Sequence, residues 1–210
     1  MPKAQKKAVG IPTIDVALVV VRVGMADGDD SNATEIAVDT ANKIAVEPQT
    51  ETTDAIKLVK LGRLIAQKPA TTTITGHQIT MTDNVFIPEL VKILQGGTVE
   101  GTGDTLTYTP PVAGSTDKGQ VFELDCYSAQ YDASGQIVRY EKITYPNCQG
   151  TPVAMSSEDD VFRVPEYTIN SAPKEGEAPY KISYTKTLPQ FTDAVALSDE
   201  DSFETGLAVN

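Results

Sequence analysis

The strongest constraint on the fold is a succession of short segments in which apolar and polar residues alternate, interrupted by Gly, Pro, Asn and Asp. Threonine occurs 25 times and valine is frequent. Such β-branched residues favour strands, and the interrupting residues favour turns. Residues 14–23 (IDVALVVVRV) are apolar on both faces of the strand that they predict, so both faces should be covered. The sequence therefore predicts a mainly β fold with antiparallel strands.

Length and charge narrow the class of protein. A chain of 210 residues is long enough for one hydrophobic core without metals or disulfides. The 29 acidic and 17 basic side chains give a net charge of -12, which argues against tight binding to a phosphate backbone. The longest apolar run, residues 16–21, is far shorter than the ~20 residues of a membrane-spanning helix, so we expect no membrane partner.

One segment, residues 83–96, departs from the strand pattern. Its apolar residues recur at helical spacing. They are Val85, Phe86, Ile87, Leu90, Val91, Ile93 and Leu94. Asp83 or Asn84 is suited to cap the start of a helix, and Pro88 fits the first turn. Gly96 supplies the left-handed residue that ends many helices. We expect a single α-helix packed on the sheet; in the alternative, a partner-binding amphipathic helix, the apolar stripe would stay exposed.

The segments before this helix predict further strands. Residues 34–46 and 53–68 are expected to be strands joined by a polar turn at residues 47–52 (EPQTET). Residues 70–82 alternate as well, but the phase of the alternation changes near Gly76. A glycine at such a phase change indicates a β-bulge.

A β-hairpin is best defined over residues 120–131 and 136–146, which flank the turn residues Asp132–Gly135. If these turn residues form the whole loop, Tyr131 faces Gln136, and this pair sets the register of the hairpin. Because successive side chains of a strand point to opposite faces, the register shows which residues of the two strands share a face.

The first face of the hairpin carries Phe122 opposite Tyr145 and should belong to the core. The second carries Asp125 opposite Lys142, with Glu123 nearby, and is polar. Polar sheet faces are ordinarily solvated, so a functional use of this face needs a separate argument.

The same register places the two cysteines far apart. Cys148 should lie opposite residue 119, which is ~23 Å along the strand from Cys126 at ~3.3 Å per residue. A disulfide requires Cα atoms within ~7 Å of each other. Both thiols are therefore expected to be free, as in a reducing cytosol.

Few residues offer catalytic or cofactor chemistry. His77 is the only histidine, which rules out a metal site built from several histidines. Its Gly-His-Gln setting predicts a hydrogen-bonding surface residue rather than a catalytic base. The glycine-rich residues 96–103 lack the Lys-Ser/Thr of a phosphate loop. The acidic residues 27–30 do not begin a calcium loop, because Asn32 and Val38 stand where Gly and Glu are needed. We expect no catalytic residue, no metal site and no cofactor.

Three stretches share the layout of a known family. They are GHQITMTDNVFIPELVKILQGGTV at 76–99, YPNCQGTPVAMSSEDDVFRVPEYTINSAP at 145–173 and YKISYTKTLP at 180–189. Together they resemble the major tail tube proteins of tailed bacteriophages and the related tubes of phage-tail-like bacteriocins. The resemblance implies an antiparallel β-sandwich or partly closed barrel with one flanking helix. It further implies a structural subunit that assembles into hexameric rings, which stack into a hollow conduit for DNA delivery.

The resemblance also implies the partners and the location of the protein. Its main partner would be further copies of itself. Its other partners would be a tape-measure protein and the tail terminator and baseplate proteins. Double-stranded DNA would pass through the tube without specific binding. The protein would be assembled in the cytoplasm of the bacterial host and would reside in the virion tail.

In such tubes an N-terminal arm and a long hairpin reach neighbouring subunits. Residues 1–13, which carry three lysines and no acid, are the expected arm. Residues 14–189 would form the β domain, with an extended hairpin around residues 41–54, and residues 190–210 an acidic tail. The candidate inter-subunit contacts are Lys3, Lys6, Lys7, Glu47, Thr50 and Glu51.

The candidate lining of the channel is the polar face of the central hairpin, with Glu123, Asp125 and Lys142, because the opposite face is needed for the core. A net acidic lining would repel phosphate and let DNA slip past.

Two other classes of function stay open at this point. One is a non-catalytic β-sandwich that binds carbohydrate or a cell surface, and the other is a hydrolase. Sugar-binding modules present exposed aromatic residues, whereas this chain has no tryptophan, and Tyr127 and Tyr140 can pack across the hairpin. For a hydrolase nothing selects a pair of carboxylates, so the sequence favours the structural subunit.

Overall fold

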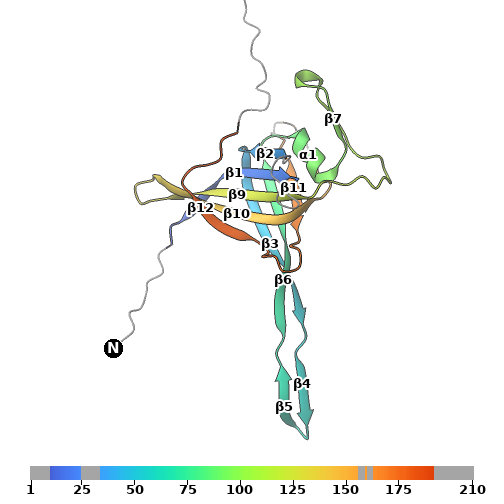
Figure 1. Ribbon diagram of the computed structural model, residues 1–210, viewed down its shortest axis with the longest axis vertical. Coiled ribbons are helices and arrows are strands. Elements are labelled where there is room, and N and C mark those ends of the chain that lie inside the picture. The colour runs from blue at the N-terminus through green and yellow to red at the C-terminus, as the bar shows by residue number, and fades with distance from the viewer. Residues whose placement is uncertain (1–9, 25–33, 156–158, 160–162, 192–210) are drawn as a thin grey trace, which may run out of the picture.

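A computed structural model describes residues 10–24, 34–155, 159 and 163–191, and one eight-stranded sheet forms its body (Figure 1). The strands of this sheet are β1 (Thr13–Val23), β2 (Thr34–Val38), β3 (Ala41–Thr53), β6 (Thr71–Asp83), β9 (Phe122–Tyr131), β10 (Ile137–Gly150), β11 (Glu166–Ser171) and β12 (Lys181–Thr185). Two small hairpins, β4 (Ile56–Lys60) with β5 (Arg63–Lys68) and β7 (Thr98–Glu100) with β8 (Thr107–Thr109), complete the strands. The helices are α1 (Pro88–Gln95) and a 3-10 turn, η2 (Gly103–Thr105).

The sheet is antiparallel throughout the described residues and runs in the order β2-β1-β9-β10-β11-β6-β3. β12 pairs with the first part of β10, and β11 pairs with its end. The sheet curls enough to bring β3 close to β1. The expected mainly β, antiparallel fold with one flanking helix is thus confirmed, in the form of a single curled sheet. Within the described part of the chain, no helix is both long enough and apolar enough to cross a membrane.

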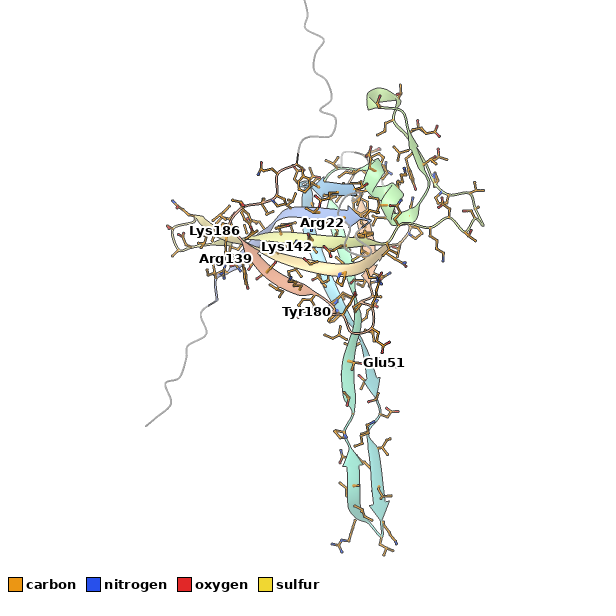
Figure 2. The ribbon with its side chains drawn as sticks, in the orientation of Figure 1. Arg22, Glu51, Arg139, Lys142, Tyr180 and Lys186 are labelled. Carbon is orange, nitrogen blue, oxygen red and sulfur yellow. The ribbon has the colours of Figure 1, made fainter. Side chains whose placement is uncertain are left out.

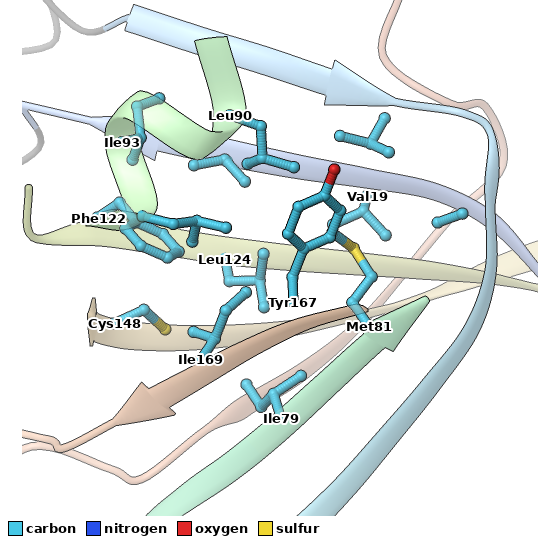
Figure 3. Packing of buried hydrophobic residues seen from close by; sticks show 14 of the residues in the cluster. Val19, Ile79, Met81, Leu90, Ile93, Phe122, Leu124, Cys148, Tyr167 and Ile169 are labelled. Carbon is cyan, nitrogen blue, oxygen red and sulfur yellow. The ribbon is translucent and has the colours of Figure 1, made fainter. Parts of the chain in front are cut away.

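Helix α1 closes the core on one face of the sheet (Figure 3). Its side chains Leu90, Val91, Ile93 and Leu94 are buried. They pack against the inward residues of the sheet, which include Val19, Val21, Ile79, Met81, Leu124, Tyr167 and Ile169. The apolar side chains of the helix itself are therefore core, as expected, whereas Val85, before the helix, is 49% exposed. The alternative of an exposed partner-binding helix is wrong.

The helix starts later than the sequence predicts. It begins at Pro88 rather than at residue 83, and its N-cap is Ile87, whose backbone is extended. A residue before proline is pushed out of the helical region, which explains the late start. Asp83 ends strand β6 instead, and its carboxylate accepts a hydrogen bond from the Val85 backbone N–H. The stop at Gly96, with φ 85°, is confirmed.

The hairpin of β9 and β10 has the expected faces but a different register. Tyr131 pairs with Ile137, and a bulge before Arg139 shifts the pairs that follow. Tyr145 therefore lies opposite Leu124 instead of Phe122. Because the shift amounts to two residues, each side chain keeps its face.

Both cysteines are free, as expected, and both are buried. A second bulge, between Tyr145 and Cys148, places Cys148 opposite Phe122 rather than residue 119. Burial raises the pKa of the Cys148 thiol to about 12, so this thiol stays protonated and acts as a small apolar side chain.

An arm projects from the body (Figure 1). We use "stalk" for its first part, residues 47–55 and 69–75, and "tip" for residues 56–68. The polar residues 47–52, expected as a turn, continue strand β3 and pair with β6. The Thr52 and Thr72 hydroxyl groups, 2.9 Å apart, form one of the cross-strand hydrogen bonds of the stalk.

The arm turns at Leu61 and Gly62 instead. Both residues have positive φ, 52° and 74°, and this two-residue connection between Lys60 and Arg63 is typical of a tight hairpin turn. Residues 53–68, expected as one strand, thus mostly form the tip hairpin. Residues 41–54, expected as a complete hairpin, form only one strand of a longer hairpin whose other strand is β6.

The base of the arm lies at the expected bulge. The pairing of β3 with β6 shifts between Gln49 and Thr50, which face Gly76 and Ile74. A Cβ atom at Gly76 would lie 2.3 Å from the carbonyl oxygen of Ser171, so only glycine fits this close approach of β11.

His77, beside this bulge, is buried rather than on the surface, so the expected surface position is wrong. It shares the inward face of β6 with Ile79 and Met81, and its ring contacts the edges of Tyr145 and Tyr180 at centroid distances of 5.5 and 5.3 Å. Burial lowers the pKa of the imidazole.

We predict that His77 makes the stability of the fold depend on pH. Because its folded-state pKa is lowered, the unfolded chain binds the proton more readily, and stability is fully present only above the unfolded pKa of about 6.5. The free energy of unfolding should therefore decrease as the pH falls from about 7.5 toward and through the folded pKa. Denaturant unfolding at a series of pH values checks this.

The matched variant is His77→Phe, which keeps an aromatic ring between the two tyrosines and cannot be protonated. Its stability relative to the wild type should improve as the pH falls. If the two proteins show the same pH dependence between about pH 7.5 and 5, His77 does not titrate with folding.

Candidate functional site

A cluster of charged side chains lies on the sheet face opposite α1. We call this surface the charged face; it consists of Arg22, Glu35, Glu123, Asp125 and Lys142 from strands β1, β2, β9 and β10. The cross-strand pairs Arg22 with Glu35 and Arg22 with Glu123 put the three residues side by side. Figure 2 labels Arg22 and Lys142 on these strands.

Asp125 is the centre of the charged face. Its carboxylate is fully buried and pairs with the Arg22 guanidinium and with the Lys142 ammonium, whose Nζ atom is 2.7 Å away. The Thr144 hydroxyl group donates a hydrogen bond to the other carboxylate oxygen at 2.5 Å. The buried charge is thus compensated by two cations and one hydroxyl donor, as such a charge requires.

Glu35 and Glu123 complete the network at its more exposed side. The Glu35 carboxylate lies 2.6 Å from Arg22 Nε, and that of Glu123 lies 3.6 Å from Arg22 Nη1. Partial burial, with the nearby Asp125 carboxylate, raises the pKa of Glu123. Three carboxylates against two cations leave this face with a net charge of about -1 when all are ionised.

The structure brings the three expected lining residues together. Glu123, Asp125 and Lys142 lie on one face, although Asp125 faces Thr144 rather than Lys142. Sequence reasoning missed Arg22 and Glu35. The available signal was Arg22 itself, the only charged residue within residues 16–23 of an apolar strand, since an isolated charge in a covered strand needs a partner.

The C-terminal part of the described chain covers one end of the same sheet face. Leu188 and Phe191 pack against a small apolar cluster of Leu18, Val20 and Tyr127. Burial of Tyr127, which is 4% exposed, removes it as an aromatic platform for sugar. The acidic tail was expected over residues 190–210, of which 192–210 lie outside the described residues.

We predict that Asp125→Asn strongly destabilises the fold. The change leaves Arg22 and Lys142 without their buried counter-charge, and breaking a buried pair typically costs about 3–5 kcal/mol. Glu123→Gln, at the exposed side of the same network, should cost less than about 1 kcal/mol. Thermal and denaturant unfolding of both variants checks the contrast, and equal losses would contradict the central role of Asp125.

The arm is the second candidate surface. Its tip carries six large apolar side chains that are at least half exposed: Ile56, Leu58, Val59, Leu61, Leu64 and Ile65. They occupy both faces of the hairpin, because Ile56 and Leu58 alternate with Val59 in β4 and Val59 pairs with Leu64 in β5. A hairpin that is apolar on both faces is typical of a segment covered on both sides. In this chain both faces of the tip are exposed to solvent.

The expected inter-subunit residues fall into two groups. Glu47, Thr50 and Glu51 are exposed on the stalk, where Figure 2 labels Glu51. Lys3, Lys6 and Lys7 lie outside the described residues, as do the acidic residues 27–30. In the described part of the chain, no three His, Cys, Asp or Glu side chains are grouped as a metal site.

No family model matches the sequence, and no curated protein matches it. Solved structures similar to this chain include chains of the anti-feeding prophage and of an extracellular contractile injection system. A chain in the 6-fold symmetrised baseplate of the anti-feeding prophage is 9% identical, with 86% of this chain and 97% of that chain covered and a TM-score of 0.38. For the extended sheath-tube complex of the extracellular contractile injection system PVC, the identity is 14%, the coverage 85% and 93%, and the TM-score 0.38. A chain in the tube-terminating cap of the anti-feeding prophage is 12% identical, with 86% of this chain and 97% of that chain covered and a TM-score of 0.39. Such values do not establish a common family.

Proposed function

We propose that this protein is the structural subunit of a tail tube, from a bacteriophage or a related phage-tail-like particle. Copies assemble into hexameric rings that stack into a hollow conduit for DNA. The observation that carries the proposal is the arm, whose tip exposes large apolar side chains on both faces. The resemblance of three stretches of the sequence to tail tube proteins supports the same assignment.

The arm needs a partner for a physical reason. Exposed apolar area contributes about 25 cal/mol per Å² when it is removed from water, so six large side chains offer several kcal/mol to a contact that covers them. Open strand edges add unpaired backbone groups, which a neighbouring strand can satisfy. A second copy of the chain is always available during assembly and can satisfy both needs.

The charged face is our proposed channel lining. Both cations of the charged face, Arg22 and Lys142, pair with Asp125, and its three carboxylates outnumber these two cations. A lining with a small net negative charge does not hold a phosphate backbone and lets DNA slide. The partners at the ends of the tube would be tape-measure, tail terminator and baseplate proteins.

We predict that polar substitutions at the tip prevent assembly without unfolding the body. The variant Leu58→Ser, Leu61→Ser, Leu64→Ser changes three side chains that are 57%, 93% and 56% exposed. It should remain folded by circular dichroism but form few or no rings or tubes in sedimentation and negative-stain microscopy. Val112→Ser, at a site that is 79% exposed and outside the arm, is the control and should assemble normally. A wild-type protein that stays monomeric at high concentration would contradict the proposed function.

We further predict that Glu123→Lys slows DNA passage. The change adds positive charge to the charged face at a side chain that is 27% exposed and leaves the buried Asp125 in place. Particles should assemble with this variant but eject DNA more slowly, and high salt should relieve the defect. Glu100→Lys, an exposed position outside this face, is the control. Normal ejection by Glu123→Lys particles would show that the charged face does not line the channel.

A further inference from the structure

The two parts of the arm carry opposite charges. The tip contains Lys57, Lys60, Arg63 and Lys68 and no acidic residue. The stalk contains Glu47, Glu51 and Asp54 and no basic residue. The tip is thus a cationic segment in a chain whose remaining residues have a net charge of -16, obtained by removing its four positive charges from the total of -12.

The tip cations are concentrated on one face of its hairpin. Lys60 pairs directly with Arg63, and Lys68 pairs with Ile56, which shares the face of Lys60. Like charges directly opposite each other destabilise a pair of strands. The Lys60–Arg63 pair is therefore unfavourable in an isolated hairpin and becomes favourable when a carboxylate of a partner lies between the two cations.

The charges of one arm are not paired with each other in the described part of the chain. Lys57 is six positions from Glu51, or ~20 Å along an extended strand, and three positions, or ~10 Å, from Asp54, both beyond the ~4 Å of an ion pair. In the part of the chain that the structure describes, no tip cation and no stalk acid forms an ion pair. All seven of these residues belong to segments that are exposed throughout.

We infer that the tip of one copy docks beside the stalk of a second copy. This inference rests on the proposed function and names the surfaces that meet. Lys60, Arg63 and Lys68 of one arm would face the stalk acids of the next, while the apolar side chains of the tip are covered by the neighbour. If each arm makes this contact in one direction only, the contact is heterologous, and repeating it produces a ring or an open-ended stack rather than a closed dimer.

A mixing experiment with two charge-reversed variants tests the contact. The tip variant is Lys60→Glu, Arg63→Glu, Lys68→Glu, and the stalk variant is Glu47→Lys, Glu51→Lys, Asp54→Lys. Each variant alone presents like charges on tip and stalk, so each should lose sedimentable tubes. In an equimolar mixture, the acidic tip of the tip variant can pair with the basic stalk of the stalk variant. The basic wild-type tip of the stalk variant can likewise pair with the acidic wild-type stalk of the tip variant. The mixture should therefore form tubes in which the two variants alternate.

Control variants separate this contact from a general effect of charge. Glu89→Lys with Glu100→Lys reverses two exposed acids outside the arm, and this protein should assemble like the wild type. Circular dichroism verifies that each variant is folded. If either charge-reversed variant assembles normally alone, or if the mixture stays unassembled while the wild type forms tubes, the tip–stalk contact is overturned and self-assembly stands. If the wild type itself does not assemble, the proposed function fails.

Discussion

The pairing of β3 with β6 is the interaction on which the rest of the structure depends, because one ladder serves two environments. In the body, the inward side chains of β6, such as Ile79 and Met81, belong to the core covered by α1. Beyond the bulge at Gly76 the same strands leave the body, and every residue of the stalk and tip is exposed. Core packing at one end therefore fixes the direction of the arm at the other, and the arm needs no core of its own.

The second face of the sheet shows how a β protein with one helix can keep polar residues in its centre. The sheet has one helix-covered face, so the opposite face must be stabilised differently. Burying Asp125 there is acceptable only because Arg22, Lys142 and Thr144 compensate its charge. Since these partners come from β1 and β10 and Asp125 itself from β9, the network also ties β1 to the hairpin of β9 and β10.

Residue alternation made much of this fold predictable, and bulges account for most of the differences. The faces of β9 and β10 follow from alternation, so Glu123, Asp125 and Lys142 were expected together, and they do lie together. Their opposed pairs were not predictable, because a bulge leaves no unambiguous mark in the sequence. The turn at Leu61 and Gly62 was missed for a different reason: residues 47–52 have turn-like composition, yet cross-strand threonine pairs keep them in a strand.

The composition of the arm meets two opposing requirements. A segment that is apolar on both faces promotes uncontrolled association, whereas a purely polar arm would offer a neighbour little binding free energy. Cations among the apolar residues of the tip keep separate tips apart by repulsion, and acids on the stalk attract them. Apolar burial can then supply most of the affinity of a contact, while charge order selects which surfaces meet and in which direction. On the charged face, the ion pairs of Asp125 likewise fix which residues of β1, β9 and β10 lie together, while the apolar core on the opposite sheet face contains most of the buried apolar side chains.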